Sequence, residues 1–174
     1  MSFVDAFRVL NGLKRRKVIR DYVVIGAVAA TNYMEPMFTE DIEVIVLVDT
    51  DEEYLSTFTA IAQQAEAQEG MHQVLGGVPV RLFPSTIMPL YRDALIGARQ
   101  VRFGNLRVKF AFAEHLILLY LLAFRERDHL RVRYLLRKID EARLQHLLNR
   151  FDDEERTLAG RLKGLRGTSI PGES

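Results

Sequence analysis

Two acidic residues, Asp41 and Glu43, stand two positions apart where the most β-branched run of the 174-residue chain begins. Side chains two apart in a strand point to the same face, so these carboxylates should lie side by side. The two carboxylates repel each other unless a cation lies between them, and protein Mg²⁺ sites are commonly built this way. The pair therefore predicts a Mg²⁺ site, with an ordinary solvated strand end as the alternative.

Gly26 and Ala27 are the second feature with chemical potential, because they follow the short apolar run 22–25. A glycine permits a sharp turn from strand to helix. The first N–H groups of a helix lack partners within the helix and can bind a phosphate. A metal held by two acids beside such a turn can move a phosphoryl or nucleotidyl group.

The elements that must position these residues follow from apolar periodicity and from turn and capping residues. Strands are expected at 22–25, 41–48, 73–75, 79–83, 100–103 and 106–110. Helices are expected at 3–18, 27–34, 50–69, 89–97, 114–125, 128–138, 140–150 and 152–163. This order predicts an α+β (α/β-like) fold, in which a mixed sheet flanked by helices is followed by a C-terminal helical part. The expected division is a sheet domain over 1–112, a helical part of the same globule over 113–165, and a flexible tail over 166–174, frayed from about residue 164.

Two segments resemble a known signature: 26–30 (Gly-Ala-Val-Ala-Ala) and 39–44 (Thr-Glu-Asp-Ile-Glu-Val). They are similar to the nucleotidyltransferase fold, in which a Gly-Gly or Gly-Ser pair precedes Thr-x-Asp-Ile-Asp. The later Glu114-His115-Leu116, Ala123 and Arg127-Asp128 resemble abortive-infection (AbiEii-like) toxins and related nucleotidyltransferase-like families of unknown function. The resemblance spans residues 20–150.

The resemblance implies roles for particular residues. Asp41 and Glu43 match the paired metal-binding, catalytic acids, with Glu in place of the usual second Asp. Gly26 and Ala27 match the turn that holds the triphosphate, and the resemblance implies that Thr39 also contacts the nucleotide.

Three positions depart from the family pattern. Arg81 stands where a third acid is usual, the family's late Lys falls on Tyr120, and the second Asp of Arg-Asp-x-x-Asp falls on Arg131. An arginine at the third position can contact a phosphate of the nucleotide, or it can pair with Asp41 or Glu43 and replace the metal.

Two functions from different classes follow. The first is Mg²⁺-dependent transfer of a nucleoside monophosphate from an NTP to a hydroxyl of an RNA, a protein or a small molecule. The second is a binding module with a degenerate site, for example with an antitoxin-like protein partner in a toxin–antitoxin-like pair. An ion pair from Arg81 to either acid favours the second. A structural oligomer assembled through the helical half is a third possibility.

Composition narrows the class of protein. Hydrophobic residues make up 48% and charged residues 27%, and cysteine is absent, which excludes disulfides and Cys-ligated zinc. No apolar run approaches the roughly 20 residues that cross a bilayer, and the first residues do not resemble a secretory signal, so we expect a cytoplasmic protein without membrane association.

Charge is segregated along the chain. Residues 35–69 hold ten acids and no Lys or Arg, whereas 99–150 hold twelve basic residues and five acids. The two halves can neutralise each other, or an acidic metal site can face a basic anion-binding wall. The block Lys14-Arg15-Arg16-Lys17 can likewise contact nucleic acid or form a solvated helix face.

Overall fold

The computed structural model describes residues 2–168. They belong to two compact units. Of these residues, 2–29 and Pro36–Ala111 form the first, here called the sheet unit, and Ala30–Glu35 and 112–168 form the second, the helical unit. Residues 169–174 of the predicted tail lie outside the described part of the chain.

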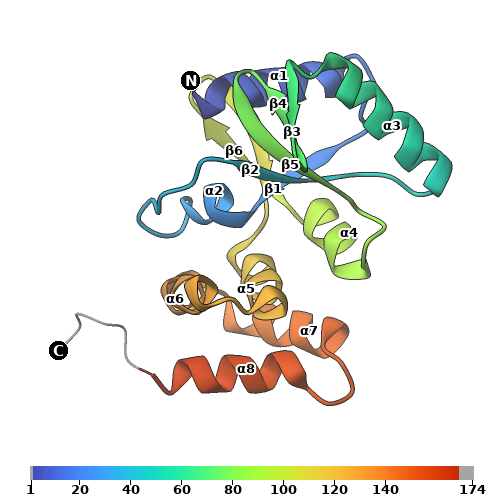
Figure 1. Cartoon of the computed structure of the whole chain (residues 1–174). Helices are drawn as coiled ribbons and strands as arrows, with labels where there is room; N and C mark the ends of the chain where they lie inside the picture. The colour runs from blue at the N-terminus through green and yellow to red at the C-terminus, as the bar shows by residue number, and fades with distance from the viewer. Residues whose placement is uncertain (1, 169–174) are drawn as a thin grey trace. The chain divides into compact units, whose positions relative to one another are not determined.

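A seven-stranded mixed sheet forms the core of the sheet unit (Figure 1). Its strands are β1 (Tyr22–Ile25), β2 (Ile42–Val46), β3 (Ala67–Glu69), β4 (His72–Leu75), β5 (Val78–Pro84), β6 (Arg99–Phe103) and β7 (Leu106–Phe110), in the order β3-β4-β5-β2-β1-β7-β6. β1 is antiparallel to β2 and parallel to β7, and β2 is parallel to β5. The predicted α+β fold with a mixed sheet is confirmed.

Helices cover both faces of this sheet (Figure 1). They are α1 (Phe3–Arg15), α3 (Asp51–Gln64) and α4 (Pro89–Ile96), with the short α2 (Gly26–Ala30) directly after β1. On α1, Phe7 meets Phe110 edge-on at 5.9 Å between ring centroids, while on α4 Tyr91 meets Phe83 at 6.0 Å. Cross-strand partners share a face of the sheet. Phe110 pairs with Val24, which pairs with Val44, whereas Phe83 pairs with Ile45, the next residue along β2, so the two phenylalanines lie on opposite faces. α1 and α4 therefore pack on opposite faces.

The helical unit contains α5 (Ala113–Ala123), α6 (Glu126–Leu135), a 3₁₀ turn (Leu136–Lys138), α7 (Glu141–Phe151) and α8 (Thr157–Arg166). α5 is apolar on nearly every side, and most of its residues are buried against α6, α7 and α8. Among residues 2–168, no helix has the length and apolar content needed to cross a membrane.

The helices predicted at 3–18 and 27–34 end earlier, at Arg15 and Ala30, and two other predicted helices differ more. α3 ends at Gln64 instead of continuing to Glu69, because Ala65 is extended and residues 67–69 pair with β4 as an additional strand. α8 begins at Thr157 instead of at Asp152 and continues through the predicted start of the tail to Arg166. Asp152 delays its start, because its carboxylate accepts the N–H groups of Leu158 and Ala159.

Candidate functional site

The predicted acidic pair lies at the start of β2. Asp41 immediately precedes the strand and Glu43 is its second residue, and the two side chains are 32% and 23% exposed. Backbone register places Glu43 between Ile25 of β1 and Arg81 of β5, and Arg81 next to His72 of β4. Since cross-strand partners share a face, Glu43, Arg81 and His72 form one polar row on the face that α4 covers.

Arg81 faces the acidic pair from β5. Its Nη1 lies 3.9 Å from Oε1 of Glu43, and its guanidinium lies 6.0 Å from the ring centroid of Phe83. Its Nε is buried and has no hydrogen-bond partner within residues 2–168. Of the two predicted roles for this arginine, the structure places it in an ion pair with Glu43.

Asp41 is held from two sides. Nε2 of His72 lies 2.9 Å from its Oδ2. The hydroxyl of Thr39 lies 3.1 Å from its backbone carbonyl oxygen and 3.3 Å from Oδ1, to both of which it can donate. Thr39, predicted at the nucleotide, thus stabilises the loop that presents Asp41.

Gly26 adopts the predicted sharp turn, with φ of +68° at the start of α2. A Cβ added at this position would lie 1.9 Å from Oε2 of Glu43. The carboxylate therefore occupies the space that any side chain here would need. The position of Glu43 is therefore a sufficient reason for a glycine at this turn, whether or not a phosphate binds there. Ala27, the next residue, is partly buried in α2.

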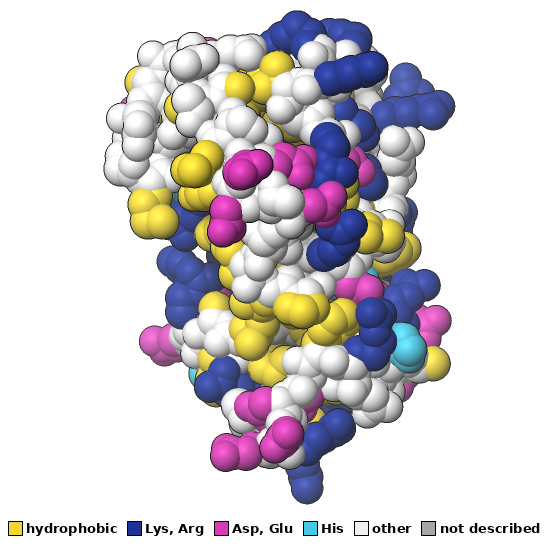
Figure 2. All heavy atoms as spheres, turned by 90° about the vertical axis from the view of Figure 1, so that its right-hand side faces the viewer, with side chains coloured by type: hydrophobic (Ala, Val, Ile, Leu, Met, Phe, Trp, Pro, Cys, Tyr) yellow, Lys and Arg dark blue, Asp and Glu magenta, His cyan; other side chains and the backbone are white. Residues whose placement is uncertain are grey.

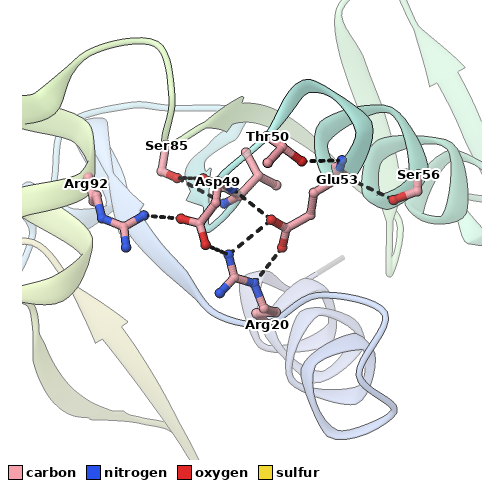
Figure 3. A network of polar contacts seen from close by, with 8 residues as sticks. Arg20, Asp49, Thr50, Glu53, Ser56, Ser85 and Arg92 are labelled. Atoms are coloured by element: carbon pink, nitrogen blue, oxygen red, sulfur yellow. Dashed lines mark hydrogen bonds and ion pairs between the residues drawn. The ribbon is translucent and has the colours of Figure 1, made fainter.

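A network of ion pairs fixes the other end of β2 (Figure 3). Arg20 binds Asp49 at 2.7 Å and Glu53 at 2.5 Å, and Arg92 of α4 also binds Asp49. Hydrogen bonds from Arg92, and then from Arg20, lower the pKa of Asp49. Figure 2, which faces α3, shows basic side chains beside the acidic ones. Part of the acidic stretch is thus neutralised within the sheet unit.

No protein-family model matches this chain, and a search of curated proteins gives no match. Among solved structures, a crystal structure of an antigenic nucleotidyltransferase-like protein from Paracoccidioides brasiliensis matches with a TM-score of 0.56. The two share 15% sequence identity over 92% of this chain and 91% of that one. The fold is nucleotidyltransferase-like. At this identity the likeness establishes the fold alone.

A Mg²⁺ ion needs an oxygen-rich site, and this nucleotidyltransferase-like fold offers a poor one at the acidic pair. Asp41 Oδ2 is engaged by His72, and Glu43 faces Arg81. Within residues 2–168 there is no group of three or more His, Asp or Glu side chains placed to hold a metal. As they stand, these contacts do not fit the predicted ion.

The other two departures from the nucleotidyltransferase-like pattern meet in the helical unit. The guanidinium of Arg131 lies 5.4 Å from the ring centroid of Tyr120, and its Nη1 bonds Oδ1 of Asp128 at 3.2 Å. Arg125 binds the same carboxylate through Nε at 2.7 Å and through its backbone N–H at 3.1 Å. Asp128 is fully buried. Tyr120 and Arg131 thus belong to one structural cluster, in which the Asp128 carboxylate compensates the charge of Arg131.

Two residues of the site were missed from the sequence. His72 directly precedes the predicted strand 73–75, and the turn at Gly76-Gly77, between this strand and the strand predicted at 79–83, fixes its register opposite Arg81. Tyr91 lacked such a signal, because only the packing of α4 on the sheet brings it to the site. Burial raises the pKa of the Tyr91 hydroxyl, and the nearby charge of Glu43 raises it further.

Proposed function

We propose that the chain is a nucleotidyltransferase-like binding module whose acidic pair is neutralised by basic side chains and which transfers no nucleotidyl group. One observation supports this most directly. Arg81, at the position of the third acid, lies 3.9 Å from Oε1 of Glu43. The His72–Asp41 contact at 2.9 Å extends the same arrangement to the second carboxylate.

Charge favours a protein ligand over a triphosphate at this site. Asp41, Glu43 and Arg81 together carry a formal charge of −1, and protonation of His72 brings the cluster only to zero. Phosphoryl-transfer sites instead surround the phosphates with cationic groups and metal ions. A nearly neutral polar row suits a protein surface better, and an antitoxin-like partner is the finer form of this proposal.

Mg²⁺-dependent transfer from an NTP to an RNA, protein or small-molecule hydroxyl is the second candidate. The long Arg81–Glu43 ion pair favours it, because at 3.9 Å the carboxylate can exchange partners. Asp41 and Glu43 would then hold the metal, and Gly26, Ala27 and Thr39 would face the nucleotide.

Thermal unfolding with Mg²⁺ or Mn²⁺ and each NTP separates the candidates. We expect no metal-dependent shift in the wild type. Arg81→Asp restores a third carboxylate opposite Glu43 and should gain a metal-dependent rise in Tm. A ligand at about 100 times its Kd stabilises by roughly 2.7 kcal/mol, a shift of several degrees.

Two further variants complete this experiment. Arg99→Asp makes the same charge change on the exposed strand β6 and should gain nothing, which excludes a general charge effect. A metal-dependent NTP shift in the wild type that disappears in Asp41→Ala would contradict the binding-module proposal and favour the transferase.

A further inference from the structure

A second polar feature lies in the β6–β7 hairpin, at the edge of the sheet that β6 forms (β6 is labelled in Figure 1). A surface hollow of about 520 Å³ is lined there by Gln100, Val101, Arg102, Asn105, Leu106 and Arg107. Sites for small ligands commonly have volumes of roughly 300–1,000 Å³. The hollow can therefore receive a group the size of a nucleotide.

Two arginines face each other across this hairpin. Arg102 of β6 and Arg107 of β7 are direct cross-strand partners, and both are exposed. Like charges at directly opposed positions destabilise a hairpin. Within residues 2–168 neither arginine has a carboxylate partner; Nε of Arg102 only donates to the Gly104 carbonyl at 3.4 Å.

Protection of a sheet edge does not explain this arrangement. Charged residues on an edge strand discourage pairing with another chain, which accounts for Arg99 and Arg102 on β6. Arg107, however, lies on the inner strand β7, where it pairs with β6 on one side and its carbonyl oxygen accepts a hydrogen bond from Nδ2 of Asn11 at 3.1 Å. An anion between Arg102 and Arg107 would relieve their repulsion and give both residues a role.

Another basic residue of the hairpin, Lys109, does have a carboxylate partner. It lies on the same face as Arg107, two residues further along β7, and its Nζ binds Asp21 at 2.5 Å. Asp21 also binds Lys14 at 2.9 Å. The sequence offers no such carboxylate nearby to the two arginines, since no acidic residue occurs between Asp93 and Glu114.

We propose that the β6–β7 hairpin binds the phosphodiester backbone of a single-stranded nucleic acid. Planar guanidinium groups match the geometry of phosphate oxygens. Gln100 shares the face of Arg102, and the amides of Gln100 and Asn105 can donate to and accept from the edge of an unstacked base. An acidic peptide added to the edge of β6 would use that strand's backbone and leave Arg107 without a function.

Binding of fluorescent oligonucleotides to the full chain tests this proposal by anisotropy. The probes are a 12-nucleotide single-stranded RNA, the same sequence as single-stranded DNA, its RNA duplex and a poly-glutamate peptide. We expect Arg102→Gln/Arg107→Gln to weaken single-strand binding at least tenfold. The slope of log affinity against log salt should fall by roughly 0.7 for each phosphate that the variant no longer neutralises. Comparing the RNA and DNA strands identifies which of them supplies the phosphodiester.

The matched control is Arg20→Gln/Arg92→Gln, which removes the same charge from arginines already paired with Asp49. It should retain the wild-type affinity. The hairpin variant should unfold at the wild-type Tm or above, because it removes a repulsion. Unchanged affinity in this variant, equal binding of the duplex, preference for poly-glutamate or no nucleic-acid binding would each overturn the proposal. Arg81→Asp leaves the hairpin intact and should not change these affinities, so failure of one proposal is distinguishable from failure of the other.

Discussion

Carboxylates meet arginines in both units, but in different environments. In the helical unit, Asp128 is fully buried and accepts bonds from Arg125 and Arg131. In the sheet unit, Glu43 is 23% exposed and Arg81 32%, and their ion pair is 3.9 Å long. Both clusters lie at positions where the chain departs from the nucleotidyltransferase pattern.

The difference separates a structural cluster from an adaptable one. A buried carboxylate that loses its partners leaves uncompensated charge in the interior, so the Asp128 cluster has a single stable arrangement. A partly exposed ion pair contributes about 0–1 kcal/mol and can be exchanged for contacts to a partner. The acidic pair can therefore change its contacts at little cost in stability.

The largest expected effect is at Asp128. Asp128→Ala leaves Arg131, whose side chain is only 11% exposed, without its carboxylate and removes the acceptor at the start of α6. We expect a loss of about 3–5 kcal/mol in the free energy of unfolding, measured in urea. Arg81→Met should cost less than about 1 kcal/mol. Similar costs for the two variants would contradict the contrast between the clusters.

Gly26→Ala should have an intermediate effect. The new Cβ would meet the Glu43 carboxylate, and an alanine at φ of +68° is strained. We expect a loss of about 1–3 kcal/mol from the clash and the backbone together. In a double-mutant cycle with Glu43→Ala, the clash disappears and only the backbone strain remains, so the two substitutions should be non-additive. Additive costs would show that Glu43 does not rest on Gly26.

A smaller effect than that of Gly26→Ala concerns Asp21, a sheet-unit carboxylate whose side chain is 20% exposed. Burial acts to raise its pKa, but hydrogen bonds from Lys109 and Lys14 outweigh it, and the net pKa lies below its ordinary value. A carboxyl pKa lowered by folding stabilises the protein above the unfolded pKa, near 4, and this stability is lost as pH falls through the folded value.

Urea unfolding between pH 2 and 7 tests this assignment. Asp21→Asn should cost about 1–2 kcal/mol at pH 7, and the difference from wild type should shrink below about pH 4. A difference that stays constant with pH would assign the effect to packing instead of charge.

Much of the fold was predictable because local signals agree with it. The Thr50 cap begins α3, the two glycine-containing turns form hairpins, and the apolar run 22–25 becomes the buried β1. Strand β3 was missed, because Ala67–Glu69 is exposed and contains no β-branched residue. It forms a strand only through its pairing with β4, which is a tertiary effect that helical periodicity does not reveal.

The candidate site was predictable only in part. The pairing of Asp41 and Glu43 on one face followed from strand periodicity, and the sharp turn at Gly26 followed from its residue type. The proximity of Arg81 to Glu43 depends on the parallel register of β2 and β5, which joins distant segments. Tyr91 reaches the site through the packing of α4, and neither contact has a local sequence signal.

The sheet order also has a consequence for synthesis on the ribosome. β1 lies between β2 and β7, and its Val24 pairs with Phe110, so one side of an early apolar strand remains open until much of the chain has emerged. Open apolar strand edges promote aggregation, and distant strand pairing slows folding. We therefore expect nascent chains that end before β7 to aggregate and to bind chaperones. Chains that include the β6–β7 hairpin should no longer do so.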